Sequence, residues 1–348
     1  MIVFGTYISC MMIHFKFFCC IKELRTPWKD HSLMRARMIE VENLTKYYGP
    51  RRAIKNLTFQ VAQGEVVGFL GPNGAGKSTT MNILSCILSA SSGTARIRGY
   101  DTFEHSLEIR KIIGYLPETP PLYPDMSVCD YLMFAAQIRG MTGKQTGNAL
   151  ERVIESCSLK DAGHRIIGRL SKGYQQRVGL AQAMVHDPDI LILDEPTIGL
   201  DPIQIIEIRK LIQELAASHT IILSSHILPE ITQICQRVII INEGEIVAVD
   251  SLEGLTASLR KSERLSLTVR NEGNKVEEKL NSIKRVLSVL PGEKNQFLLE
   301  CELNSKLQDE IARLALENQW GLVEIKPLSL TLEDVFLKLT IEEKDVKA

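Results

Sequence analysis

The 348-residue sequence lacks an excess of either charge sign. Its 41 basic and 42 acidic residues leave a formal net charge of −1. Proteins that coat a polyanion carry a strong positive field, so this balance argues against a nucleic-acid-coating role. Charged residues make up 24% of the chain, close to the average for folded proteins. That share argues against both wholesale disorder and a protein of many membrane spans.

The cysteines lack the spacing of a metal or redox site. There are eight of them, and no two form a C-x-x-C pair. We interpret them as buried or incidental thiols in a reducing compartment. With 45% apolar residues, a chain of this length can form one large core or two ordinary ones. The composition therefore predicts an intracellular globular protein.

The opening residues 1–37 lack the features of a clean membrane span or signal peptide. His14 and Lys16 interrupt their apolar run, and a charge near mid-membrane costs about 2.5–3.5 kcal/mol. A signal peptide needs a basic stretch before the apolar one, whereas the first lysine is Lys16. We expect an extension that is disordered or an over-extended reading of the gene, with Met38 as the natural start. A membrane-contacting arm and ordered packing are the alternatives.

A glycine-rich segment is the first strong motif. A buried strand is predicted for residues 65–70 and a helix for 80–88, and the motif G-x-x-x-x-G-K-[ST] lies between them. Glycines let backbone N–H groups surround phosphates, and the following helix adds its positive end. We expect Lys77 to reach the β- and γ-phosphates and Ser78 to bind Mg²⁺. The predicted nucleotide-binding residues of this loop are Gly71, Asn73, Gly74, Ala75, Gly76, Lys77, Ser78 and Thr79.

Two adjacent carboxylates follow a second apolar run. Residues 189–193 predict a buried strand, and Asp194 and Glu195 stand at its carboxyl end. In a parallel sheet this edge carries the ligand site. We expect Asp194 to hold Mg²⁺ and Glu195 to polarise the attacking water, a role worth about 10²–10⁴-fold in rate.

Between these motifs lies Leu170-Ser171-Lys172-Gly173-Tyr174-Gln175-Gln176-Arg177. By itself this segment predicts only a capped helix, with Ser171 at the N-cap and apolar residues following at helical spacing. Its local signal is weak. Further along, Ser224-Ser225-His226 ends a strand predicted for residues 220–223.

Taken together, the order of these segments resembles the ATP-binding subunit of an ABC transporter, over about Met38 to Val249. The resemblance implies an α/β P-loop NTPase cassette in residues 38–260. Its parts would be a RecA-like core, an antiparallel β subdomain and a helical subdomain at about 118–185. Met38 to Leu44 alternates in polarity, which predicts an edge strand.

The resemblance also implies roles for further residues. Tyr48 would stack on adenine, with Tyr47 as the alternative, and His226 would contact the γ-phosphate. Ser171 and the Gly173 backbone N–H would close on the ATP held by a second copy, in a head-to-tail homodimer. Asp201, in Gly199-Leu200-Asp201, would bridge the two copies near the attacking water.

Three positions depart from the family pattern. Lys172 and Tyr174 replace a glycine and a glutamine of the signature segment, and Gln175 is a candidate substitute for that glutamine. Glu118 stands where the family usually has glutamine. Ionised glutamate cannot donate a hydrogen bond, but it can bind Mg²⁺ or accept from water. We expect ATP hydrolysis to survive these changes.

The family resemblance implies an integral membrane permease as partner and a peripheral position on the cytoplasmic face of the inner membrane. Leu122, Tyr123 and Met126 are candidates to line the groove for the permease, with plain loop packing as the alternative. Residues 329–337 resemble the tail of exporter ATPases of the ABC-2 group, which includes drug-resistance and gliding-type systems. ATP and Mg²⁺ are the implied cofactors.

Residues 261–348 predict a second, small α+β domain. Their strand and helix patterns follow the order βαββαβ, which favours a ferredoxin-like fold, and a last helix is predicted for 332–339. No catalytic or metal cluster occurs in this part of the sequence. We expect a dimerising or regulatory role, with a purely structural role as the alternative.

Two other functions fit the sequence less well. A soluble ABC-type ATPase acting on nucleic acid or ribosomes usually carries two cassettes or a long insertion, and this chain has one cassette and a near-neutral charge. A GTPase or kinase is disfavoured because the guanine-reading motif Asn-Lys-x-Asp is missing. We therefore expect an ATP hydrolase that drives transport, in the export direction, with no nucleic acid as partner.

Overall fold

The computed structural model describes residues 36–251, 253–255, 263–271, 275–292, 295–302 and 307–328. The interpretation of the N-terminal extension and the helix predicted for 332–339 lie outside these residues. Among the described residues, none of the helices is both long enough and apolar enough to cross a bilayer.

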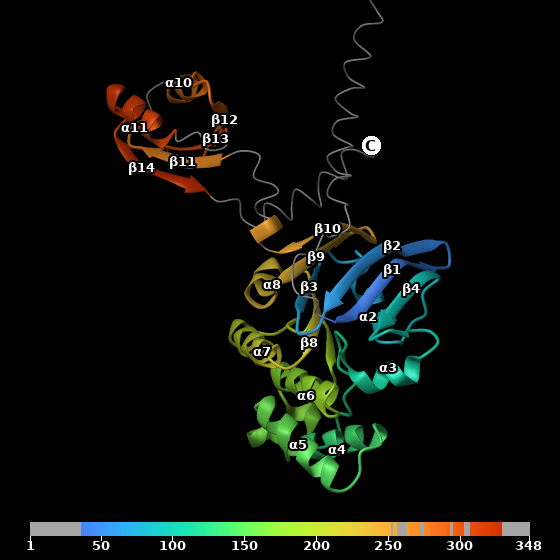
Figure 1. Cartoon of the computed structure of the whole chain (residues 1–348). Helices are drawn as coiled ribbons and strands as arrows, with labels where there is room; N and C mark the ends of the chain where they lie inside the picture. The colour runs from blue at the N-terminus through green and yellow to red at the C-terminus, as the bar shows by residue number, and fades with distance from the viewer. Residues whose placement is uncertain are drawn as a thin grey trace, which may run out of the picture.

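A six-stranded sheet forms the centre of the larger unit (Figure 1). Its strands lie in the order β10-β9-β3-β8-β7-β6, and all neighbours are parallel except β10, which runs antiparallel to β9. Strands of a parallel sheet are buried on both faces, which explains their continuous apolar sequences. The strands are β3 (Val66–Leu70), β6 (Ile113–Leu116), β7 (Ile190–Asp194), β8 (Thr220–Ser225), β9 (Arg237–Asn242) and β10 (Glu245–Ser251).

Alternate residues of this sheet enter two different hydrophobic cores. In β7, Leu191 and Leu193 pack into one core, and Ile190 and Ile192 pack into the other. The first core includes the helices of the lower part of Figure 1, and the second joins the sheet to α2 and to the antiparallel strands. The sheet therefore holds its carboxyl edge rigidly from both sides.

A second, antiparallel sheet has the strand order β2-β1-β4-β5. The strands are β1 (Arg37–Tyr48), β2 (Arg51–Ala62), β4 (Ser92–Ile97) and β5 (Tyr100–Asp101). The predicted edge strand from Met38 is wrong in its position, because β1 pairs with β2 on one side and β4 on the other. Alternation showed that one face is buried, but it carries no information about distant partners.

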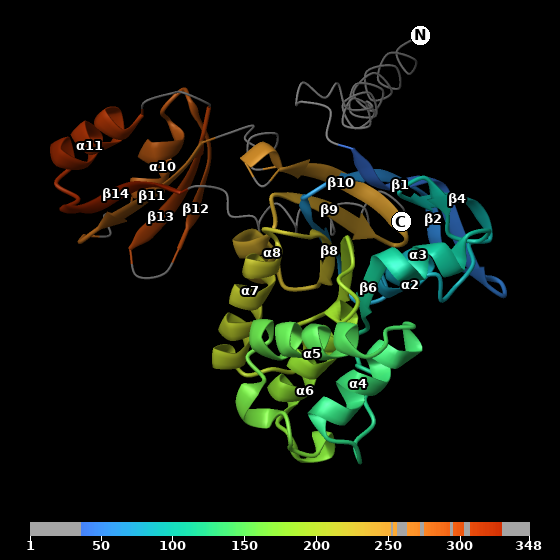
Figure 2. The same ribbon diagram turned by 60° about the horizontal axis from the view of Figure 1, so that its bottom comes forward.

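The helices fall on both sides of the central sheet. α4, α5 and α6 contact one another and form a separate lobe, seen at the bottom of Figures 1 and 2. α2 begins and ends earlier than the helix predicted for 80–88. The α-helices are α2 (Lys77–Leu84), α3 (Ser106–Ile112), α4 (Val128–Ile138), α5 (Lys144–Ser156), α6 (Lys172–Met184), α7 (Pro202–Leu215) and α8 (Leu228–Ile234). Two 3₁₀ turns, Lys160–Ala162 and Ile167–Arg169, precede α6.

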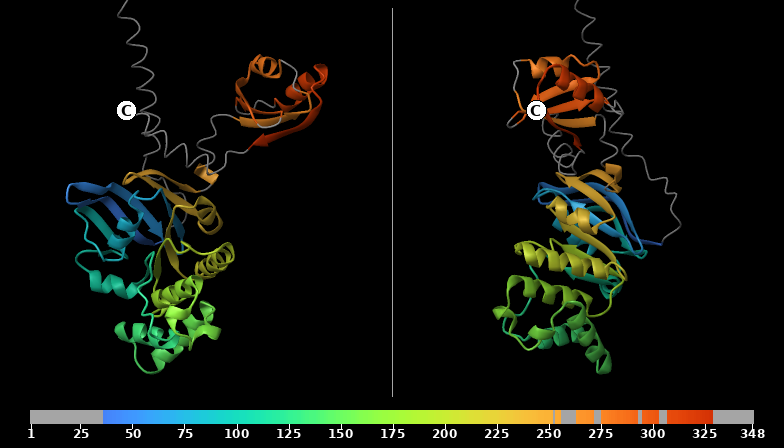
Figure 3. Two further views of the ribbon diagram at one scale, coloured as in Figure 1. Left: turned by 180° about the vertical axis from the view of Figure 1, so that it is seen from behind. Right: turned by 90° about the vertical axis from the view of Figure 1, so that its left-hand side faces the viewer.

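The C-terminal unit, coloured orange to red in Figure 3, has the βαββαβ order that the sequence predicts. Its sheet has the order β12-β13-β11-β14, and every neighbouring pair is antiparallel. A core of its own contains Leu267, Leu280, Leu299 and Ile311. The elements are β11 (Glu263–Val269), α10 (Val276–Asn281), β12 (Val286–Pro291), β13 (Gln296–Cys301), α11 (Gln308–Glu317) and β14 (Leu322–Leu328).

Candidate functional site

The strand order brings the predicted site residues to one edge. β8 lies between β3 and β7, and β6 is the next strand beyond β7. Because these strands are parallel, their carboxyl ends meet at the same edge. The glycine-rich loop leaves β3, Asp194 ends β7, and His226 follows β8. Residues more than 140 positions apart in sequence therefore converge there.

The glycine-rich loop needs glycine at two positions for steric reasons. Gly76 has φ 105°, and a Cβ atom there would lie 2.6 Å from Ile54 Cγ2. A Cβ atom at Gly71 would lie 2.3 Å from the carbonyl oxygen of Ile241. Neither position admits a side chain without displacing the backbone or the core. Packing therefore enforces the open backbone curve that phosphate binding uses.

Lys77 extends across this loop toward the end of β7. Its side chain is buried, and its Nζ donates to the Gly71 carbonyl oxygen at 2.8 Å and the Pro72 carbonyl oxygen at 3.3 Å. The same Nζ lies 3.2 Å from Glu195 Oε1. A phosphate that enters the loop would meet a buried, already positioned ammonium group.

Glu195 and His226 form a direct pair. Glu195 Oε2 lies 2.8 Å from His226 Nδ1. The Glu195 backbone is left-handed, with φ 48°, a conformation that costs a non-glycine residue about 1–3 kcal/mol. Its backbone N–H donates to Ser224 Oγ at 2.9 Å, and Ser224 Oγ donates to Asp194 Oδ1 at 2.5 Å. Ser224 thus holds the strained residue and its neighbouring carboxylate together.

Asp194 is a buried acid, 2% exposed, with an altered pKa. Burial raises its pKa above the usual value, and Glu195 and Glu118 act in the same direction. Hydrogen bonds from Ser224 and Ser78 oppose this rise. The structure thus brings together all three predicted metal ligands, Ser78, Asp194 and Glu118, although Glu118 acts on Asp194 only electrostatically.

These groups fit Mg²⁺ only together with phosphate oxygens. Among the described residues, no group of three or more His, Cys, Asp or Glu side chains could hold a metal ion. Mg²⁺ in proteins usually keeps one or two carboxylate ligands and completes its octahedron with water and substrate phosphates. One buried carboxylate beside one hydroxyl, at the mouth of a phosphate loop, matches that pattern.

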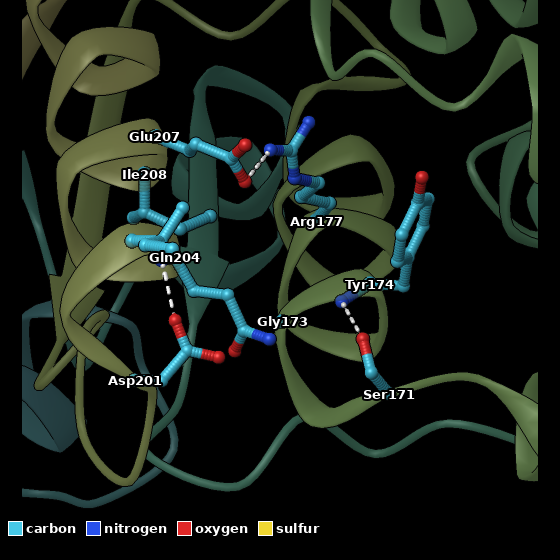
Figure 4. A pocket seen from close by; sticks show the side chains of 9 residues that line it. Ser171, Gly173, Tyr174, Arg177, Asp201, Gln204, Glu207 and Ile208 are labelled. Carbon is cyan, nitrogen blue, oxygen red and sulfur yellow. Dashed lines mark hydrogen bonds and ion pairs between the residues drawn. The ribbon is translucent and has the colours of Figure 1, made fainter.

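Three further predicted site residues, Ser171, Gly173 and Asp201, line a separate hollow of about 290 Å³ between α6 and α7 (Figure 4). Ser171 is the N-cap of α6, as predicted, and its Oγ accepts from the Tyr174 backbone N–H at 3.4 Å. Asp201 is the N-cap of α7, and its Oδ1 accepts from the Gln204 backbone N–H at 2.9 Å. Two helix starts therefore face the same hollow.

Contacts between α6 and α7 hold the wall of this hollow, and one residue that departs from the family pattern, Tyr174, lines it. Arg177 pairs with Glu207 at 2.5 Å and lies over the Tyr174 ring, 5.7 Å from its centroid. Gly173 packs closely on Gln204, and a Cβ atom at Gly173 would lie 2.7 Å from that side chain. The Lys172 ammonium approaches Gly199, whose φ is 68°.

The proposal that Gln175 substitutes for the missing signature glutamine is not supported. Its Nε2 donates to the carbonyl oxygens of Ile167 and Leu170, at 3.1 and 3.3 Å. These bonds fasten α6 to the turn before it, so the amide is engaged in the fold. A one-residue shift along a helix rotates a side chain by about 100°, which explains the difference.

Two aromatic side chains compete for the adenine-stacking role. Tyr47 is 45% exposed and Tyr48 is 47% exposed, so burial does not distinguish them. Lys46 Nζ lies 5.6 Å from the centre of the Tyr48 ring. Both rings remain available at the end of β1.

Of the three candidate groove residues, Leu122 and Met126 pack against the large core, while Tyr123 is 50% exposed. The plain-packing alternative therefore accounts for the first two. Tyr123 contacts Tyr131 and Phe134 through its ring and keeps half of its surface open.

Sequence reasoning assigned no function to three residues beside the site. Ser224 bridges Asp194 and Glu195, while Thr197 and Glu230 share a buried hydrogen bond of 2.6 Å. The available signal was only a pair of serines before the histidine and an acid four residues after it. Their role depends on contacts between segments about thirty residues apart.

Comparisons with known proteins identify the family of this chain. Residues 54–198 match the family described as ABC transporter. The chain is 35% identical over 304 residues to the bacitracin transport ATP-binding protein BcrA of Bacillus licheniformis, covering 87% of this chain and 97% of that protein. The chain belongs to the ATP-binding proteins of ABC transporters. The cassette fold and phosphate loop expected from the sequence are thereby confirmed.

Two further similarities extend this result. The chain is 29% identical over 305 residues to the linearmycin resistance ATP-binding protein LnrL of Bacillus subtilis strain 168, covering 87% of this chain and 98% of that protein. An ATP-binding cassette solved as a dimer in a post-hydrolysis state with ADP and Pi covers 62% of this chain and 99% of its own, at 26% identity and a TM-score of 0.57. This ABC ATPase binds nucleotide and hydrolyses ATP as the ATP-binding subunit of a transporter.

Proposed function

We propose that this ABC ATPase powers export by a separate membrane permease, through ATP-driven closure of two cassettes head to tail. The relatives support the export direction, since one is named for bacitracin transport and another for linearmycin resistance. The solved dimeric cassette supports closure between two copies. The chain would act at the cytoplasmic face of the inner membrane, held there by its permease.

The separation of two half-sites is the observation that carries this proposal. Lys77 and Glu195 form one buried cluster with the half-buried His226, whereas Ser171 and Asp201 cap helices that face the hollow. In the described structure, no hydrogen bond or ion pair joins the two groups. A second copy would bring its Ser171 and the backbone N–H of its Gly173 to the phosphates held by the first.

Within one cassette, each residue of the buried cluster has a distinct task. Lys77 would exchange its contacts with the loop carbonyls and Glu195 for contacts with the β- and γ-phosphates. That exchange releases Glu195 Oε1 for an attacking water, while Oε2 stays close to His226. His226 would orient the carboxylate and contact the γ-phosphate. Proton removal by a positioned base contributes about 10²–10⁴-fold to rate.

Mg²⁺ would neutralise charge on the β- and γ-phosphates and orient them for in-line attack. Ser78 and Asp194 would hold it directly or through water, with Glu118 nearby. Tyr48 or Tyr47 would stack on the adenine. Asp201, whose Oδ1 already caps α7, would use its second oxygen at the junction with the other copy.

The decisive experiment tests whether ATP closes two copies into a dimer. Glu195→Gln protein is mixed with Mg-ATP, and its mass is measured by size-exclusion chromatography with light scattering. We expect a dimer with ATP and a monomer with ADP; a monomer in both conditions, also with the permease present, would contradict the proposal.

Affinity purification from membranes tests the permease. We expect a partner with about six spanning segments to co-purify with the wild-type chain. Tyr123→Asp should reduce recovery of this partner and leave ATP hydrolysis by the isolated chain unchanged. Recovery of ribosomes or nucleic acid in place of a membrane protein would favour the alternative function.

A further inference from the structure

A buried carboxylate in α8 has no part in the hydrolytic scheme above. Glu230 is 5% exposed, and its Oε2 accepts from Thr197 Oγ1 at 2.6 Å and from Ser225 Oγ at 3.0 Å. Burying a carboxylate costs several kcal/mol unless hydrogen bonds compensate. Hydrogen bonds from hydroxyl groups to a carboxylate are charge-assisted, and the bond from Thr197 is also short. The three residues therefore form a buried hub.

The first arm of this hub, the hydrogen bond from Thr197 to Glu230, fixes the loop after β7. The Ile198 backbone N–H donates to the Glu195 carbonyl oxygen at 3.1 Å, and the Leu200 backbone N–H donates to the Thr197 carbonyl oxygen at 3.3 Å. Thr197 is thus the pivot between Glu195 and the turn that leads to Asp201. Its side chain is fixed by Glu230.

The second arm controls the turn that carries His226. Ser225 Oγ accepts from the Ile227 backbone N–H at 2.9 Å. This bond joins the residue before His226 to the residue after it. The same hydroxyl donates to Glu230 Oε2. His226 Nδ1 in turn lies 2.8 Å from Glu195 Oε2. A closed ring therefore runs from Glu195 through Thr197, Glu230 and Ser225 to His226. Three of its links are side-chain contacts, and the chain itself joins Glu195 to Thr197 and Ser225 to His226.

We propose that Glu230 is a positioning residue that locks the loop of residues 195–201 to the turn of His226, so that water activation and the contact with the second copy are set together. The inference rests on the proposed function, because the second copy is reached through Asp201. Glu230 itself touches no reacting atom. Without the Glu230 carboxylate, the loop of residues 195–201 and the turn of His226 would each keep their backbone hydrogen bonds. They would lose their fixed position relative to each other.

The test uses substitutions of similar size. Glu230→Met removes the acceptor, whereas Glu230→Gln keeps one oxygen that can accept from both hydroxyls. We expect Glu230→Met to lower kcat at least tenfold with KM for ATP within twofold of wild type, and Glu230→Gln to keep at least half of kcat. Rates are measured per nucleotide-competent site, counted by titration with a fluorescent ATP analogue.

Double variants separate positioning from loss of fold. Thr197→Val should lower kcat, and the Thr197→Val/Glu230→Met pair should be no slower than Glu230→Met alone, because both remove the same link. Thr232→Val is the matched control: its hydroxyl lies on the same helix and donates only to the Pro229 carbonyl oxygen. It should leave kcat unchanged.

Three results would overturn the inference: wild-type kcat in Glu230→Met, losses that multiply in the double variant, or a loss that disappears when rates are expressed per competent site. These results are distinct from failure of the proposed function. If the Glu195→Gln protein forms a dimer with ATP while Glu230→Met behaves as wild type, only the role of Glu230 is wrong. If no dimer forms, closure is wrong whatever Glu230 does.

Discussion

The phosphate-loop cluster and the hollow between α6 and α7 are built in opposite ways. In the cluster, Lys77 and Glu195 are buried and lie 3.2 Å apart. In the hollow, Ser171 and Asp201 use their oxygens for helix caps and face open space (Figure 4). The cluster already contains a buried cation, the proposed general base Glu195 and its partner His226. The hollow contains hydrogen-bonding groups without a substrate-binding loop, so it is suited to complete a site elsewhere.

The largest effect should come from the cluster. Glu195→Gln keeps the shape of the side chain but cannot take a proton, so ATP hydrolysis should fall about 100-fold or more. Removing the charge next to Lys77 should leave ATP binding intact or tighter. Phosphate release and equilibrium ATP binding measure the two quantities. Glu214→Gln, on the exposed side of α7 with only an i,i+4 lysine as partner, is the matched control and should hydrolyse normally.

Retention of more than a tenth of wild-type turnover in Glu195→Gln would remove Glu195 as the base. The cluster could then no longer be distinguished from the hollow as the region that activates water.

A smaller loss of ATP hydrolysis should come from placing a negative charge in the hollow, at Ser171. Asp and Asn both replace Ser well at a helix N-cap. Ser171→Asp should nevertheless suppress hydrolysis at least tenfold, because its carboxylate would face the triphosphate of the second copy. Ser171→Asn should lose less. ATP affinity of the monomer should stay within about threefold in both variants, as measured by fluorescence titration at low protein concentration.

If Ser171→Asp weakened ATP binding by the monomer as strongly as it slowed hydrolysis, the hollow would act on ATP of its own chain. That result would break the distinction between the two regions.

A third effect concerns stability and pH. Burial raises the pKa of Asp194, so its ionised form is disfavoured in the fold. Its contribution to stability is therefore present at low pH and is lost as pH rises through the raised pKa. Asp194→Asn should raise Tm at neutral pH by about 2–4 °C, for a gain of about 1 kcal/mol. The difference should vanish below the ordinary pKa of aspartate.

Thermal unfolding without nucleotide, from about pH 3 to pH 8, measures this trend on both sides of the ordinary aspartate pKa. A variant less stable than wild type at neutral pH would show that hydrogen bonds from Ser224 and Ser78 outweigh burial. In that case the ionised form of Asp194 would be stabilised in the fold despite its burial.

The smallest effect should come from the rim of the hollow. Arg177 and Glu207 join α6 to α7, but Glu207 is 49% exposed, and such pairs contribute about 0–1 kcal/mol. Glu207→Gln should change Tm by no more than about 3 °C and leave ATP affinity of the monomer unchanged. A larger loss of hydrolysis than of stability would show that the angle between the two helices matters for closure.

Much of this fold was predictable because its signals are local. The phosphate loop, the carboxylates after β7 and the N-cap at Ser171 each follow from a few neighbouring residues. The βαββαβ order of the C-terminal unit likewise follows from polarity patterns along the chain. The position of β1 between two partners was not predictable, because β4 approaches from fifty residues away.

Tertiary contacts also decided the parts of the site that motifs do not show. Ser224 could not be assigned to the Glu195 backbone, nor Glu230 to Thr197, since these pairs meet only after β7 and β8 lie side by side. The case of Gln175 differs, because its amide bonds locally to the carbonyl oxygens of Ile167 and Leu170 in the turn before α6.

By itself, the sequence determined which chemical groups this protein has for ATP, because glycines, lysine and carboxylates at fixed spacings set the local backbone and its charge. The tertiary structure alone decided which groups meet. It paired Lys77 with Glu195 and His226 with Glu195, and left Ser171 facing a hollow. The physical reason is that a parallel sheet aligns the carboxyl ends of distant strands at one edge, whereas Ser171 and Asp201 stand at the starts of α6 and α7, which face the hollow.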